Sequence, residues 1–199
     1  MARVPDLRKA AVHLARLMGP DDCMLVGGMA VGAYGYVRAT KDVDFVVRVS
    51  LEEVVARLAK QHISTTRTRG DPLEGDFPCV KGILDGVPFD VMPPLVSLDW
   101  ERVVEMPMGK GITLKVVSLE GLIRLKMRAQ GPRDLLDVAA LVTQHPEQMG
   151  LAKELATAYR VADNLDVWLR DPRLRAELES LASTKASRPR RRRARGKKA

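Results

Sequence analysis

Two aspartates interrupt an apolar run in the first quarter of the chain, where residues 42–47 read DVDFVV. The β-branched residues predict a strand over residues 42–49. Side chains alternate along a strand, so Asp42 and Asp44 share one face, while the apolar residues beside them lie on the other. Two carboxylates this close repel each other, and their pKa values rise unless a cation lies between them. Mg²⁺ accepts such oxygen ligands and bridges to phosphates, so the pair predicts a magnesium site.

A double glycine comes before this strand. Residues 23–26 form a short apolar run that stops at Gly27 and Gly28, and the apolar spacing predicts a helix over residues 29–37. Glycine lets a ligand approach the backbone closely, and the first turn of a helix offers unpaired N–H groups at the positive end of its dipole. A strand, a glycine turn and a helix in this order predict a site for a phosphate chain.

A third carboxylate, Asp90, lies in the apolar run over residues 87–92. This run and residues 80–84 flank Asp85-Gly86, which is the strongest hairpin signal in the chain. An acid inside an apolar strand needs a reason, and Asp90 would complete a two-metal site with the earlier pair. The ordinary alternative is an aspartate on the solvent-facing side of an edge strand.

The remaining patterns predict a small mixed sheet with flanking helices, followed by a helical C-terminal part. Apolar residues at helical spacing predict a helix over 6–18, and Ser50 opens another with a capping box. The fold class is therefore α/β (α+β), with a domain over 1–147, a helical extension over 148–183 and a disordered basic tail over 184–199. Further strands are predicted over 63–68 and 112–117, a loop over 69–78, and helices over 119–130, 132–144, 151–169 and 172–181.

The positive charge is concentrated at the C-terminus. The chain has a formal net charge of +8, from 33 basic and 25 acidic residues. Nine of the basic residues and none of the acidic ones lie in residues 185–199, so the rest of the chain is close to neutral. A run of four arginines repels itself and predicts a disordered tail that could bind RNA or DNA phosphates. The run is Arg190, Arg191, Arg192 and Arg193. The alternative is a solvated tail that aids solubility or binds weakly to any polyanion.

The absence of several sequence motifs argues against some classes of protein. It has no dinucleotide-binding or P-loop glycine motif and no serine-hydrolase motif, and its three histidines lack the spacing of zinc ligands. No apolar run is long enough to span a bilayer, and the N-terminus does not read as a secretory signal. Cys23 and Cys79 form no Cys-x-x-Cys pair and suit a reducing compartment as buried thiols. We therefore expect a cytoplasmic protein without membrane contact.

The double glycine, the Asp-x-Asp strand and the later single aspartate together resemble the DNA polymerase beta-like nucleotidyltransferase superfamily. The string LVGGMAV followed by RATKDVD is similar to its small prokaryotic members, among them the abortive-infection type nucleotidyltransferase toxins. Those toxins also carry a basic residue in a later helix and then an Arg-Asp-x-x-Asp segment. This chain has Lys126 and then Arg133, Asp134 and Asp137. The resemblance covers about residues 25–142 and implies the nucleotidyltransferase fold.

The resemblance implies a role for each of these residues. The acids Asp42, Asp44 and Asp90 would be catalytic and bind Mg²⁺, and Asp90 would help to activate the attacking hydroxyl. The other residues would hold the nucleotide or support the site. The nucleotide-binding residues would be Gly27, Gly28, Arg38, Thr40 and Lys126, and the supporting residues Arg133, Asp134 and Asp137.

These features lead to the hypothesis of a Mg²⁺-dependent nucleotidyltransferase that moves a nucleoside monophosphate from a nucleoside triphosphate (NTP) to an acceptor hydroxyl. The acceptor could be RNA such as tRNA, recruited by the tail, or a protein. The chain could serve a toxin–antitoxin or phage-defence system with a cognate partner protein. One alternative is a non-catalytic nucleic-acid-binding or antitoxin-like protein of the same fold. The other is a small-molecule antibiotic adenylyltransferase, for which the tail would be dispensable.

Overall fold

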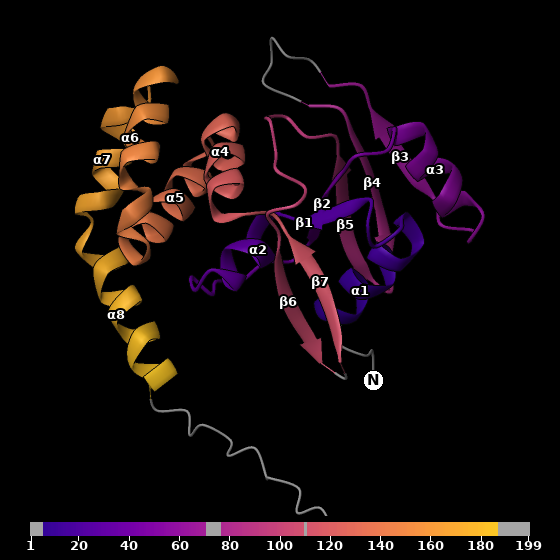
Figure 1. The fold of residues 1–199 in the computed structure, drawn as a ribbon, viewed down its shortest axis with the longest axis horizontal. Helices are drawn as coiled ribbons and strands as arrows, with labels where there is room; N and C mark the ends of the chain where they lie inside the picture. The colour runs from indigo at the N-terminus through magenta and orange to yellow at the C-terminus, as the bar shows by residue number, and fades with distance from the viewer. Residues whose placement is uncertain (1–5, 71–76, 110, 187–199) are drawn as a thin grey trace, which may run out of the picture.

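A mixed β-sheet forms the centre of the protein, whose computed structural model describes residues 6–70, 77–109 and 111–186. The strands are β1 (Cys23–Leu25), β2 (Val43–Val47), β3 (Thr65–Thr68), β4 (Cys79–Leu84), β5 (Val87–Met92), β6 (Val104–Gly109) and β7 (Ile112–Val116). Within the described residues these seven strands form one sheet in the order β3-β4-β5-β2-β1-β7-β6 (Figure 1). The predicted α/β fold with a mixed sheet is therefore confirmed.

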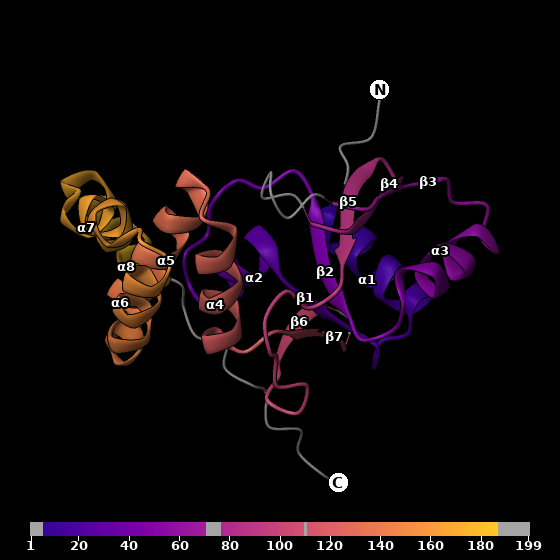
Figure 2. The same ribbon diagram turned by 90° about the horizontal axis from the view of Figure 1, so that it is seen from above.

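Helices cover the sheet in two groups. They are α1 (Leu7–Met18), α2 (Gly27–Ala33), α3 (Leu51–Ala59), α4 (Leu119–Ala129), α5 (Pro132–Gln144), the 3-10 turn η1 (Pro146–Gln148), α6 (Met149–Ala158), α7 (Ala162–Arg170) and α8 (Pro172–Ala186). α1 and α3 lie on one side, with α2 and α4 on the other and the remaining helices beyond them (Figure 2). The predicted cap at Ser50 is confirmed, because its Oγ accepts a hydrogen bond from the backbone N–H of Glu53.

The central strands bring predicted acids together. β2 pairs with β1 in the antiparallel sense and with β5 in the parallel sense, where Asp44 lies opposite Asp90. The predicted hairpin is also confirmed, since β4 and β5 pair across Asp85 and Gly86. Both turn residues have positive φ angles, 54° and 77°, as a tight two-residue turn requires. The parallel pairing of β5 with β2 thus places Asp90 beside Asp44.

Two helices and one strand differ from the predictions. α2 begins at the glycine turn itself and ends where Gly35, with a φ of 115°, turns the chain. The single helix predicted over 151–169 is wrong: α6 and α7 are separate because Arg160 adopts a left-handed backbone with a φ of 58°. β6 escapes prediction because it is an edge strand that carries Glu105 and Pro107 in place of a continuous apolar run.

The C-terminal helices pack on one another as a group. α4 packs against α5 and α6, and α5 also packs against α7 and α8. The predicted domain boundary at residue 147 falls within η1 and stays a prediction. α8 continues to Ala186, and the four tail arginines, 190–193, lie outside the described residues. No helix in the described ranges has the length and apolar character needed to cross a membrane.

Candidate active site

The glycine turn between β1 and α2 packs against side chains from the segment that leads into β2. Gly27 has a φ of 62°, and a Cβ at this position would collide with the carboxylate of Asp44. A Cβ on Gly28 would lie 2.9 Å from Thr40 Oγ1 and 3.2 Å from Arg38 Nη1. Gly27 is therefore required for its backbone conformation as well as for space, and Gly28 for space. The sequence predicts glycine for the approach of a ligand, and in the structure both residues also make room for neighbouring side chains.

Three acids, Asp42, Asp44 and Asp90, form the centre of the candidate site. Asp44 and Asp90 pair directly in the parallel strands β2 and β5, so their side chains leave the sheet on the same face. Asp42 lies two residues before Asp44, at the entrance to β2. Burial, followed by the charges of Asp42 and Asp90, raises the pKa of Asp44 to about 7. The structure thus brings Asp42 and Asp90 close enough to Asp44 for their charges to act on it.

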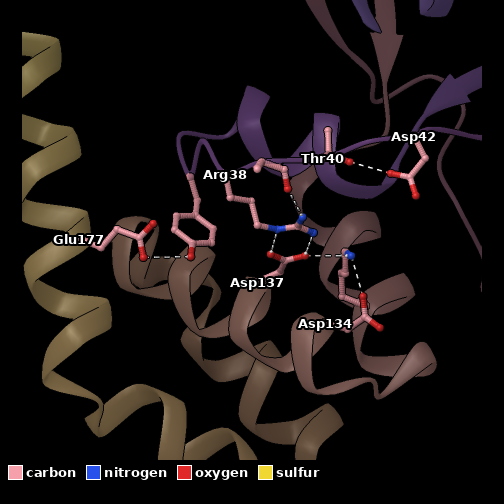
Figure 3. Close-up of polar contacts among 9 residues, drawn as sticks. Arg38, Thr40, Asp42, Asp134, Asp137 and Glu177 are labelled. Carbon is pink, nitrogen blue, oxygen red and sulfur yellow. Dashed lines mark hydrogen bonds and ion pairs between the residues drawn. The ribbon is translucent and has the colours of Figure 1, made fainter. Parts of the chain in front are cut away.

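Two of the acids have polar partners nearby. Thr40 Oγ1 donates a hydrogen bond of 2.7 Å to Asp42 Oδ1 (Figure 3). Lys81 Nζ lies 3.0 Å from Asp90 Oδ2, and these two residues are opposite each other in the β4–β5 pair. Sequence reasoning misses Lys81. The hairpin turn could have revealed it, because a two-residue turn at 85–86 sets Lys81 opposite Asp90.

The chemistry of the three acids fits Mg²⁺. Carboxylate oxygens are its preferred protein ligands, and a divalent cation would relieve the repulsion that acts on Asp44. In the part of the chain that the structure describes, no three His, Cys, Asp or Glu side chains already form a metal-binding group. Asp42 and Asp90 each direct an oxygen toward Thr40 or Lys81 instead.

A buried ion-pair network lies beside the acids and joins three parts of the chain (Figure 3). Arg38, from the segment before β2, makes two hydrogen bonds to Asp137 of α5, Nε–Oδ1 at 2.6 Å and Nη2–Oδ2 at 2.7 Å. Lys126 Nζ of α4 lies 2.9 Å from Asp137 Oδ2 and 2.6 Å from Asp134 Oδ1. Among the described residues, Asp137 is the one charged side chain that is fully buried. The network therefore fixes α4 and α5 relative to the strand that carries Asp44.

The network gives Arg38 and Lys126 partners that sequence reasoning does not assign. Burial acts to lower the pKa of Lys126, but the carboxylates of Asp134 and Asp137 outweigh it and hold the pKa above its usual value. Lys126 therefore keeps its positive charge, which acts to lower the pKa of Asp44. Arg133 is exposed in the first turn of α5 and shows no polar contact within the described residues.

A hollow of about 570 Å³ opens beside the glycine turn. Gly28, Arg38 and Thr40 border it, together with apolar walls from Met29 and Val37. Its volume falls in the range of small-molecule sites in proteins. A ligand in this hollow could reach Gly28, Arg38 and Thr40, whereas Asp42, Asp44 and Asp90 do not border it.

One family of known proteins matches nearly the whole chain. The sequence pattern of the family described as "Nucleotidyl transferase AbiEii toxin, Type IV TA system" matches residues 12–197. The chain belongs to the AbiEii family. It is therefore a nucleotidyltransferase of the toxin–antitoxin class, and the resemblance to abortive-infection nucleotidyltransferase toxins is confirmed. No protein with curated annotation matches this AbiEii member.

Several solved structures are similar in outline to this AbiEii member. JHP933 from Helicobacter pylori is 12% identical, with 93% of this chain and 97% of that one covered and a TM-score of 0.40. The antibiotic-resistance factor ANT(2'')-Ia is 17% identical over 90% and 96% of the two chains, with a TM-score of 0.40. The Megavirus polyadenylate synthase is 11% identical over 94% of this chain and 36% of that one, with a TM-score of 0.41. These similarities are distant, and the family assignment rests on the sequence match.

Proposed function

We propose that this AbiEii-family protein transfers a nucleoside monophosphate from an NTP to an acceptor hydroxyl in a Mg²⁺-dependent reaction centred on Asp44. One observation carries the proposal: Asp44 and Asp90 pair on adjacent strands, and burial followed by the charges of Asp42 and Asp90 raises the pKa of Asp44 to about 7. Perturbed carboxylates of this kind cluster at functional sites. The site lies at the glycine turn, where a phosphate chain can approach the backbone.

Each proposed residue has a task that its position allows. Asp42, Asp44 and Asp90 would hold Mg²⁺, which when bound supplies positive charge opposite the triphosphate. The acceptor oxygen would form a bond to the α-phosphorus while the bond to pyrophosphate breaks, and Asp90 would accept the hydroxyl proton. The glycine turn would hold the phosphates, and Lys126, whose side chain is 11% exposed, would stabilise the leaving pyrophosphate.

The charges around the acids favour a polyanionic acceptor such as RNA or tRNA. Three exposed basic residues lie next to these acids or their network. Lys41 precedes Asp42 in the sequence, Lys81 pairs with Asp90, and Arg133 precedes Asp134. The basic residues of the tail add further cations that would attract phosphates. A protein hydroxyl remains the second acceptor class. The type IV toxin–antitoxin family supports a cognate antitoxin partner, and buried free thiols at Cys23 and Cys79 support a cytoplasmic setting.

Thermal unfolding tests the nucleotide site directly. With an NTP at about 100 times its dissociation constant, Mg²⁺ present, binding adds roughly 2.7 kcal/mol and should raise Tm by about 5–10 °C. The rise should depend on Mg²⁺ and should identify the preferred NTP among the four. Asp42→Ala/Asp44→Ala should show no rise above its own ligand-free Tm. A full rise in this double variant would place the nucleotide elsewhere, and no rise with any NTP would favour the non-catalytic alternative.

Removal of the basic tail separates an RNA acceptor from a small-molecule acceptor. A chain that ends at Ala186 loses eight of the nine C-terminal basic residues. We expect NTP-induced stabilisation to be unchanged, while transfer of label to RNA falls about 10-fold or more at physiological salt, because phosphate contacts are lost. The measurement is transfer of label from an NTP labelled at the α-phosphate. Equal transfer by both chains would point to an acceptor that does not need the tail.

A further inference from the structure

Alternate residues of the segment between α2 and β2 face inward. Residues 34–42 form no helix or strand, yet Tyr36 is buried and Arg38 and Thr40 are partly buried, while Val37 is 59% exposed. An extended chain places successive side chains on opposite sides. The side chains of Tyr36, Arg38 and Thr40 therefore form one inward-facing row, and Asp42 follows this row at the next alternate position.

The C-terminal part of the chain holds three alternating residues of this segment, and the contacts of Glu177 and Arg38 are drawn in Figure 3. His145, which follows α5, donates a hydrogen bond from Nε2 to the carbonyl oxygen of Tyr34 at 2.9 Å. The hydroxyl of Tyr36 donates to Glu177 Oε2 of α8 at 3.3 Å. The third residue is Arg38, which donates two hydrogen bonds to Asp137 of α5. Three alternating positions of one short segment are thus attached to α5 and α8.

The other end of the row reaches a proposed catalytic acid. Thr40 Oγ1 donates to Asp42 Oδ1, and both Thr40 and Arg38 pack against Gly28 at the start of α2. The segment is therefore clamped between the glycine turn on one side and the C-terminal helices on the other. A shift of its attachment to the helices would displace the carboxylate of Asp42.

We propose that α5 and α8 set the position of Asp42, with Tyr36 and Glu177 as positioning residues. The inference rests on the proposed role of Asp42 in nucleotide transfer. Tyr36 is 2% exposed, and burial followed by the charge of Glu177 raises its pKa to about 12, so the hydroxyl remains a donor at neutral pH. α8 itself is anchored by the buried side chains of Leu174 and Leu178. The helical C-terminal part, whose role the sequence leaves open, is thus a support of the active site.

Hydrogen exchange in the full chain tests the attachment without any need for activity. Tyr36→Phe removes only the hydroxyl, Glu177→Ala removes the acceptor, and Glu177→Gln keeps an oxygen that can accept. We expect the amides of Tyr34 and Gly35, which donate hydrogen bonds at the start of this segment, to exchange about 10-fold faster in the first two variants, with wild-type rates in the central strands. Glu177→Gln should stay near wild type. The matched controls Tyr159→Phe and Glu154→Gln, both from the α6 region, should leave the rates unchanged.

Nucleotide transfer is the second measurement, followed as label from an α-phosphate-labelled NTP into total bacterial RNA and protein. We expect kcat to fall about 10-fold in Tyr36→Phe and Glu177→Ala with KM for the NTP within about twofold, because a displaced acid slows the chemical step more than binding. Glu177→Gln should retain most of the rate. Unchanged exchange at Tyr34 and Gly35, an equal increase throughout the chain, or a loss confined to KM would overturn the proposal. A wild-type chain without transfer would refute the proposed function, while the exchange result still decides the attachment.

Discussion

Asp137→Ala is expected to lower the free energy of unfolding by about 3–5 kcal/mol, because it leaves buried cations without their shared anion. Asp137 is fully buried, and it contacts Arg38 through two hydrogen bonds and Lys126 through one ion pair. For a chain of this size the loss corresponds to a fall in Tm of roughly 10 °C. Urea and thermal unfolding of the full-length protein measure it.

Two control variants separate this buried network from ordinary surface charge. Asp166→Ala removes an exposed pair with Arg170 on α7 and should change the free energy of unfolding by less than about 0.5 kcal/mol. Arg38→Met combined with Asp137→Ala should recover part of the stability, since it removes one of the unpaired cations. If Asp137→Ala behaved like Asp166→Ala, the ion-pair network would not hold the helices to the sheet.

Local patterns predict much of this fold because they depend on neighbouring residues. The hairpin at Asp85-Gly86 follows from two residues that accept positive φ, and the apolar spacing of α1 follows from its own helical face. The pairing of Asp44 with Asp90 is only partly local, since it also requires β2 and β5 to be neighbours in the sheet. The family resemblance, rather than any local pattern, predicts that Asp90 lies near Asp44.

The ion-pair network shows what sequence patterns leave out. Arg38 and Asp137 are 99 residues apart, and no periodicity or motif spacing links them. By resemblance alone, Arg38 is assigned to nucleotide binding, whereas the structure gives it a buried carboxylate partner. The contact of Tyr36 with Glu177 spans 141 residues and is equally invisible from the sequence. Long-range polar contacts of this kind depend on how the helices pack against the sheet.

Asp44→Asn is expected to stabilise the ligand-free protein at alkaline pH. The pKa of Asp44 is raised from 3.8 to about 7, mainly by burial and then by Asp42 and Asp90. A group with a raised pKa in the folded state contributes stability below its unfolded pKa, and this contribution is lost as pH rises toward 7. Asparagine resembles the protonated acid and has no such loss. The difference in unfolding free energy between variant and wild type should therefore grow by roughly 3 kcal/mol between pH 4.5 and pH 8.

Denaturant unfolding at the two pH values measures this difference, with Asp163→Asn as the control. Asp163 is exposed near the start of α7, and its substitution should not reproduce the pH-dependent gain. A gain for Asp44→Asn of equal size at both pH values would mean that the charge of Asp44 is not destabilising in the folded protein.

The same substitution should reduce nucleotide transfer by about 10³-fold or more, because the variant lacks a carboxylate that would hold Mg²⁺. A residue whose removal stabilises the fold and stops the reaction is retained for function, since packing alone would favour its replacement. Both effects come from one carboxylate, which is buried and lies close to the charges of Asp42 and Asp90. Addition of Mg²⁺ with an NTP at pH 8 should therefore stabilise the wild type more than Asp44→Asn. Transfer at the wild-type rate by the variant would remove Asp44 from the active site.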